Sequence, residues 1–184
     1  MTLEQVRDYA KTRGFHPQTL ARLSGWSPSA SAALGRLALT LKISENHLRD
    51  LMDWLEEIAV RDNRAIDAIL ADKVIADIET DPRLGRGDKL KRFKEEIRRR
   101  RFPRLARTED TLRARISELK LQPEIMLSAP PGLEGGKLRV EFSASSQQDL
   151  RRLAAKLADA AEKEATKEAF ELLSGVAADT ELND

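Results

Sequence analysis

The chain has 184 residues, enough for one or two small domains, and 41% of them are hydrophobic, which supports a buried core. Only 4% are aromatic, so aliphatic side chains must fill most of that core. The absence of cysteine excludes disulfides and thiolate metal sites, and no apolar run is long enough for a signal peptide or a membrane span. We therefore expect a cytoplasmic protein with no cofactor and no membrane partner.

The charges are distributed very unevenly along the chain. The formal net charge is +1, but residues 45–81 contain eleven acidic and four basic side chains. Residues 83–107 reverse this balance, with twelve basic and three acidic side chains. Adjacent segments of net −7 and +9 can attract each other, and the basic one can also bind a polyanion such as nucleic acid.

Three short helices are predicted before residue 45. Thr2 to about Lys11 forms the first, and Pro17 begins a second that ends at Gly25. Ser27 and Pro28 begin the third, because proline at the first helical position loses no needed hydrogen bond. Helix, short glycine turn and helix is the layout of a helix-turn-helix.

Two features of this predicted helix-turn-helix are unusual. Ser31 occupies a position that in this motif is commonly buried and β-branched, and Trp26 makes a bulky turn. The predicted recognition helix carries a single cation, Arg36, with serines and alanines where base readout favours Arg, Lys, Asn or Gln. The sequence leaves open whether Arg36 contacts DNA or whether these helices serve packing alone.

Amphipathic helices are predicted for the acidic segment. Ser44 caps the first, whose apolar face comprises Leu48, Leu51, Met52, Leu55, Ile58 and Ala59. The second runs from Ala65 to Ile78, with Ile66, Ile69, Leu70 and Val74 on its apolar face. Thr80 to Gly87 then reads as a linker, so the sequence predicts a helical domain over residues 1–80.

A strongly basic helix is predicted after this linker. Leu90, Phe93 and Ile97 give it a narrow apolar stripe up to Phe102, and residues 81–107 are assigned as linker and basic helix. The side chains expected to contact phosphates are Lys89, Lys91, Arg92, Lys94, Arg98, Arg99, Arg100, Arg101 and Arg104. The alternative is that this helix docks on the acidic segment 45–81.

The segment from Pro123 to Leu157 predicts a β-hairpin followed by a helix. Ile125, Leu127 and Ala129 alternate with polar residues, as do Leu138, Val140 and Phe142, and PPGLEGG forms the turn. Ser145 and Gln148 suggest a capping box for the following helix. With a helix from Thr108, this gives an α-β-β-α domain over residues 108–175 and a frayed acidic tail over 176–184. The predicted fold class is mainly α with a small β-hairpin.

A lone two-stranded hairpin is marginally stable, and its open edges invite pairing. Two copies joined about a two-fold axis would form a four-stranded sheet, so we expect a homodimer. The alternative is a monomeric hairpin covered by its own helices. The residues assigned to the dimer interface are Ile125, Leu127, Leu138, Val140, Phe142, Leu150, Leu153 and Leu157.

Two segments of the chain resemble ParB-type chromosome- and plasmid-partitioning proteins. GGKLRVEFSAS followed by QQDLRRL is similar to their C-terminal dimerisation domain, and LARLSGWSPSASAALGRLAL is similar to their helix-turn-helix core. The resemblance implies dimerisation and non-specific DNA contact by Lys137 and Arg139. The arginine-rich GERR-type motif of the family's CTP-binding domain does not occur here, so the resemblance does not imply nucleotide binding or clamp sliding.

The sequence offers little for catalysis. It has two histidines, no cysteine, no Gly-rich phosphate loop and no paired carboxylates in a recognisable pattern, so we expect no enzyme. The leading hypothesis is a dimeric ParB-like protein that associates with double-stranded DNA in the bacterial nucleoid and takes part in DNA partitioning. The alternative is an adaptor or scaffold dimer that binds another protein and no DNA.

Overall fold

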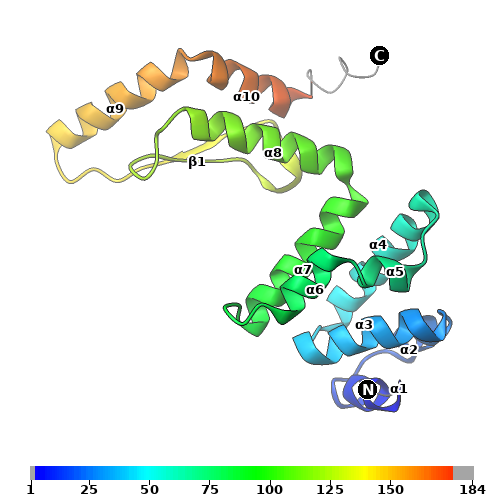
Figure 1. Ribbon diagram of the computed structural model, residues 1–184. Coiled ribbons are helices and arrows are strands. Elements are labelled where there is room, and N and C mark those ends of the chain that lie inside the picture. The colour runs from blue at the N-terminus through cyan, green and yellow to red at the C-terminus, as the bar shows by residue number, and fades with distance from the viewer. Residues whose placement is uncertain (1–2, 176–184) are drawn as a thin grey trace. The chain divides into compact units, whose positions relative to one another are not determined.

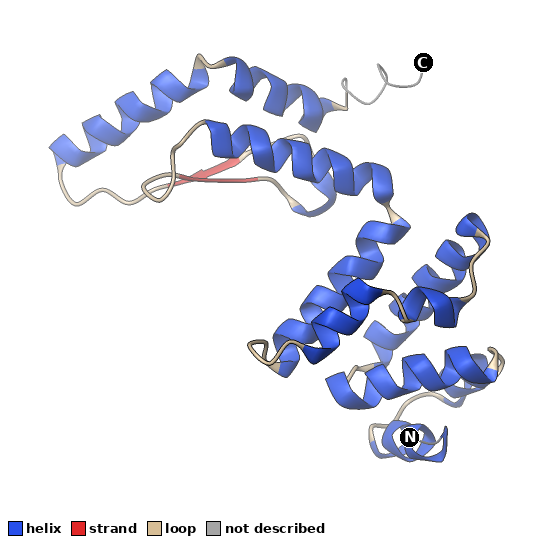
Figure 2. Cartoon of the chain, viewed as in Figure 1, coloured by secondary structure: helices blue, strands red, loops and turns tan. Residues whose placement is uncertain are grey.

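The computed structural model describes residues 3–175, which form helices and one small sheet (Figures 1 and 2). The chain divides into two compact units, residues 1–102 and residues 103–184, called here the N-terminal and the C-terminal unit. Ten α-helices and one two-stranded antiparallel sheet lie within the described residues, which confirms the predicted fold class. Within the same range, no helix has the length and hydrophobicity needed to cross a bilayer.

Helices are the only regular secondary structure among the described residues of the N-terminal unit. Its helices are α1 (Leu3–Thr12), α2 (Pro17–Ser24), α3 (Pro28–Leu41), α4 (Glu45–Asp62), α5 (Ile66–Leu70), α6 (Lys73–Thr80) and α7 (Arg86–Arg101). The predicted starts at Pro17 and Pro28 are confirmed, and Ser27 Oγ accepts a hydrogen bond from the Ala30 N–H at 3.3 Å.

One continuous apolar core joins the helices of the N-terminal unit. Leu34, Leu55 and Phe93, from α3, α4 and α7, are among its fully buried side chains. Gly35 lets α1 pack closely against α3, because a Cβ at this position would lie 2.7 Å from Val6 Cγ2. The core is aliphatic, as the composition requires.

The predicted helix from Ala65 to Ile78 is instead two helices, α5 and α6, with a turn at Ala71 and Asp72. The turn changes the rotational phase of the second helix. Ile75 therefore points inward, with 1% of its surface exposed, and Val74 points outward with 47% exposed. The sequence prediction placed Val74 on the apolar face because it extended a single helical period through the turn.

The division between units also differs from the predicted boundary at residue 80. Residues 81–85 form a loop, but α7 packs on α3, α4 and α6 and belongs to the N-terminal unit. Phe93 and Ile97, the apolar stripe of the predicted basic helix, are 1% and 0% exposed in that core. The stripe is thus filled by contacts within the unit, and the units divide at Phe102 and Pro103.

The C-terminal unit combines a hairpin with three helices. These elements are α8 (Pro103–Glu118), β1 (Met126–Ser128), the short 3₁₀ helix η1 (Pro131–Leu133), β2 (Arg139–Glu141), α9 (Gln147–Ala161) and α10 (Glu164–Ser174). The strands pair antiparallel, with Leu127 opposite Val140. The described helix α8 begins at Pro103 rather than at Thr108, and the predicted long final helix is broken after Ala161.

Two small apolar clusters hold this unit together. Ile125 and Leu153 belong to the first, between the hairpin and α9, and Leu112 and Leu173 belong to the second, between α8 and α10. Ser146, not Ser145, caps α9: its Oγ accepts from the Asp149 N–H at 3.1 Å, and Asp149 accepts from the Ser145 N–H. Gly175 ends α10 in the left-handed conformation, and the predicted tail 176–184 lies outside the described residues.

Candidate nucleic-acid interface

Helix α7 carries most of the predicted phosphate-binding cations, and several of them face the protein itself. Lys94 Nζ lies 3.2 Å from Asp50 Oδ2 and 5.6 Å from the centroid of the Trp54 ring, both on α4. Arg100 forms ion pairs with Asp72 and Glu96, and Arg101 pairs with Glu57. These contacts correspond to the docking alternative, in which basic α7 lies on the acidic helices.

Lys89, Arg98 and Arg99 are also partly enclosed. Lys89 Nζ donates to the Glu79 carbonyl oxygen at 2.7 Å, and Arg98 forms a two-point hydrogen bond to Glu95 at 2.8 Å. Arg99 is half-buried. Glu95 of the same helix therefore partly neutralises Arg98, and the backbone of α6 orients Lys89.

A smaller group of cations at the start of α7 faces solvent. Arg86, Lys91 and Arg92 are exposed, and neither Arg86 nor Lys91 forms an ion pair with another described residue. In the preceding loop, hydrogen bonds from Arg83 lower the pKa of Asp81 to about 2, and Arg92 adds a weaker electrostatic contribution. Asp81 therefore stays ionised next to a locally basic surface.

The helix-turn-helix candidate, α2 to α3, is tied to the acidic helices in the same way. Arg36, its predicted DNA contact, pairs with Glu79 of α6 and keeps 42% of its side chain exposed. The two unusual residues each have a structural role. Ser31 is buried and its Oγ donates to the Leu23 carbonyl oxygen at 2.5 Å, while Trp26 Nε1 donates to Glu56 Oε1 at 2.7 Å.

Glu56 is the centre of this anchor between α2 and α4. Besides Trp26, it accepts two hydrogen bonds from Arg22, whose third nitrogen contacts Asp53 Oδ1 at 2.6 Å. The hydrogen bonds from Arg22, followed by that from Trp26, lower the pKa of Glu56 from its ordinary 4.5 against the opposing effect of burial. Glu56 in turn raises the pKa of Arg22.

The lowered pKa of Glu56 makes the stability of this anchor pH-dependent. Its contribution is complete above the ordinary pKa of 4.5 and disappears as the pH falls through the lowered pKa of the folded state. Because 38% of the Glu56 side chain is exposed, we expect at most about 1 kcal/mol. Chemical denaturation of the wild type and of Glu56→Gln between pH 7 and pH 3 measures it. The stability difference between the two proteins should shrink on acidification; a constant difference would contradict the assignment.

The remaining predicted DNA contacts lie in the C-terminal unit. Arg104, in the first turn of α8, is exposed, as are Lys137 and Arg139 of the hairpin. Arg139 Nη2 lies 2.6 Å from Glu141 Oε1 on the same strand. Lys137 forms no ion pair with a described residue, so its charge is less neutralised than that of Arg139 and can contact a phosphate more readily.

The residues assigned to a dimer interface fall into an inner and an outer set. Ile125 and Leu153 are buried within the unit, and Leu127 and Leu157 are half-buried beside them. Leu138 is half-buried against the second cluster, that of Leu112 and Leu173. The outer set remains exposed and consists of Val140, Phe142 and Leu150, with 41%, 37% and 48% of their surfaces accessible. The inner residues stabilise the monomer fold, and the outer ones are available for contacts beyond it.

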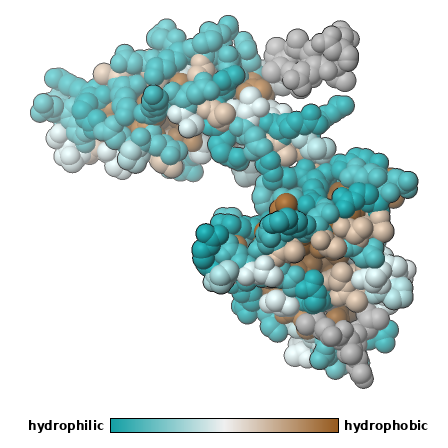
Figure 3. Space-filling view, in the orientation of Figure 1, coloured by the Kyte–Doolittle hydropathy of each residue, from teal (hydrophilic) through white to brown (hydrophobic). Residues whose placement is uncertain are grey.

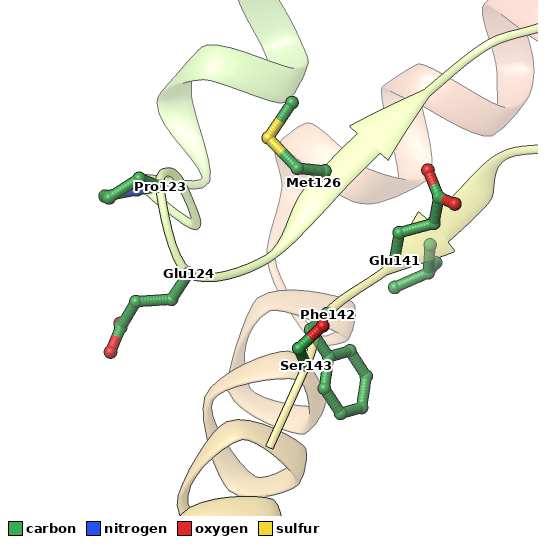
Figure 4. A pocket seen from close by; sticks show the side chains of 7 residues that line it. Pro123, Glu124, Met126, Glu141, Phe142 and Ser143 are labelled. Carbon is green, nitrogen blue, oxygen red and sulfur yellow. The ribbon is translucent and has the colours of Figure 1, made fainter. Parts of the chain in front are cut away.

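An open groove of about 590 Å³ borders the outer set at the end of the hairpin (Figure 4). Met126 and Glu141 point to one side of the hairpin, as their cross-strand pairing requires, and Phe142 points to the other. Pro123, Glu124, Val140 and Ser143 complete the lining. Hydrophilic residues cover most of the face of the C-terminal unit that is drawn in Figure 3.

Sequence reasoning missed two parts of the charge arrangement. It did not identify Asp50, Glu57 and Asp72 as the acceptors for α7, which requires knowledge of how α4 and α6 pack. It also missed Arg13 and Lys42, which lie within 6 Å of the centroid of the Tyr9 ring. The scarcity of acidic residues before Glu45 was the available signal for the second site.

Comparison with protein-family models, curated proteins and solved structures gives no match for the chain.

Proposed function

We propose that the chain is a dimeric, non-catalytic, ParB-like protein that associates with double-stranded DNA, largely without reading its sequence. The observation that carries this proposal is that Arg86, Lys91 and Arg92 of α7 are each exposed to solvent. This exposure remains after the fold has neutralised neighbouring cations such as Lys94 and Arg100. When exposed arginine and lysine contact the phosphates of a duplex, counterions are released from the DNA, and this release supplies sequence-independent affinity.

The proposed dimer forms through the hairpin of the C-terminal unit. Within the described residues the sheet has two strands, so each has an edge without a strand partner. All three residues of β2 are exposed, while Leu127 of β1 is half-buried, which favours β2 as the pairing edge. Val140 and Phe142 would lose their solvent exposure in such a pairing.

Replacement of Lys91 and Arg92 by Gln tests the DNA-binding part of the proposal. Fluorescence anisotropy with a labelled 30-base-pair duplex would follow affinity over a range of salt concentrations. The slope of log affinity against log salt should become shallower by about 1.8, since each phosphate contact contributes about 0.9. Duplexes of unrelated sequence should be affected equally.

The matched control is the double variant Arg64→Gln/Lys73→Gln, which removes the same charge from cations paired with Asp72 and Asp77. It should leave the slope unchanged. Wild-type protein that fails to bind any duplex at low salt would reject the DNA-binding function.

A protein-binding adaptor is the second candidate. It is favoured by the docking of Lys94, Arg100 and Arg101 within the fold, because this reduces the charge available to a polyanion. Exposed Val140, Phe142 and Leu150 would then be the contact residues. An aliphatic interface of this type would bind its partner with little dependence on salt, in contrast to phosphate contact.

A further inference from the structure

The residues preceding α4 carry an excess of positive charge, most of it outside the predicted DNA-contact set. Residues 1–44 contain six basic and two acidic side chains, a net charge of +4. Arg22 and Arg36 pair with acidic residues of α4 and α6. The other four form no ion pair with a described residue, and they are Arg7, Lys11, Arg13 and Lys42.

Two of these cations meet at one aromatic ring. The guanidinium carbon of Arg13 lies 5.9 Å from the centroid of the Tyr9 ring, and Lys42 Nζ lies 5.2 Å from the same point. The two charges are therefore at most 11.1 Å apart, the sum of these distances. Arg13 follows α1 and Lys42 follows α3, so the packing of the two helices brings them together.

The fold holds the ring in place between these cations. The Tyr9 hydroxyl donates to the Ile43 carbonyl oxygen at 3.0 Å. The ring also packs edge-to-face on Phe15, with 5.8 Å between centroids and an interplanar angle of 73°. These two contacts hold the Tyr9 ring in a fixed position, and both cations lie next to it.

The backbone of Lys42 is held in an unfavourable conformation. Lys42 is the C-cap of α3 with φ of 54°, a left-handed value that glycine or asparagine adopts far more readily. Residues kept in such conformations are concentrated at functional sites. The conformation also fixes where the lysine stem leaves the helix, close to Tyr9.

We propose that Arg13 and Lys42, arranged around Tyr9, form a phosphate-contact site for the backbone of double-stranded DNA. The site rests on the proposed DNA-binding function and is separate from the cations of α7. An arginine fork binds one phosphate through two hydrogen bonds, and lysine places a compact charge on a neighbouring phosphate of the backbone. The aromatic face only weakly compensates two cations at an exposed site, so an anion is the partner that this arrangement lacks.

The test is the double variant Arg13→Gln/Lys42→Gln in the full chain, titrated with the same labelled duplex across salt concentrations. Loss of two phosphate contacts should make the salt slope shallower by about 1.8. The charge-retaining swap Arg13→Lys/Lys42→Arg should keep the wild-type slope, and so should Arg64→Gln/Lys73→Gln. Inorganic phosphate in place of added chloride, at matched ionic strength, should compete weakly with the duplex if the site recognises phosphate itself.

A second variant separates binding from folding. Lys42→Gly removes one charge and relieves the left-handed backbone, so the melting temperature should rise by about 2–5 °C while the salt slope becomes shallower by about 0.9. An unchanged slope in both Lys42→Gly and the double Gln variant would overturn the site. If Lys91→Gln/Arg92→Gln still weakened binding, the proposed function would stand without it. Wild-type protein that binds no duplex would overturn both.

Discussion

Replacing Phe93 by Ala should lower the free energy of unfolding of the N-terminal unit by about 3–5 kcal/mol. Phe93 is 1% exposed and lies in the core that joins α3, α4 and α7. Truncation to Ala removes apolar contacts and leaves a cavity that the surrounding leucines can fill only partly. The measurement is urea denaturation followed by the fluorescence of Trp26 and Trp54, which both belong to this unit.

The matched control is Lys91→Ala, on the exposed face of the same helix, which should change the stability by less than about 0.5 kcal/mol. This comparison decides the assignment of α7. If α7 lay in a mobile linker, the Phe93 substitution would not change the free energy of unfolding of α1 to α6. Equal stability of the two variants would therefore restore the predicted boundary at residue 80.

The second large effect concerns association of the C-terminal unit. Replacing Val140 by Lys should weaken the proposed dimer by at least about 30-fold. The symmetric interface would then enclose two unpaired charges, each costing about 1–3 kcal/mol or more. Because 41% of Val140 is exposed in the single chain, the substitution does not place a charge in its core. Sedimentation equilibrium across micromolar concentrations measures the change.

Lys163→Ala provides a surface control for this experiment, since Lys163 is exposed beyond the end of α9. It should sediment like the wild type. A wild-type chain that remains monomeric at high micromolar concentration would reject the dimer and leave the hairpin as a self-sufficient element covered by its helices.

Local signals predicted much of this fold. Proline at the first helical position and glycine after the last one act within a few residues, so the starts at Pro17 and Pro28 and the end at Gly175 could be read directly. The hairpin could also be predicted from the sequence, because alternation and turn residues determine which side chains share a face. Leu127 and Val140 are paired as that alternation requires.

Other features of the fold depend on tertiary packing and could not be predicted from local signals. No residue in ILADK requires a helix to stop, yet the turn at Ala71 and Asp72 lets α6 place Ile75 instead of Val74 in the core. Likewise, a run of arginines attracts acidic helices and phosphates by the same physics. The burial of Phe93 and Ile97 fixes the orientation of α7, and this orientation determines which of its cations remain exposed.

Each unit has buried apolar clusters of its own among the described residues, and this has a consequence for how the protein melts. A domain whose folding includes association gains stability with protomer concentration by mass action, whereas a domain with a complete core of its own does not. Calorimetry should therefore resolve two transitions. With dimerisation through β2, the transition of the C-terminal unit moves to higher temperature as the protein is concentrated, and that of the N-terminal unit stays fixed. The chain would then lose its partner before it loses its helical core when diluted, so dilution alone becomes a switch between a bivalent and a monovalent ligand for DNA.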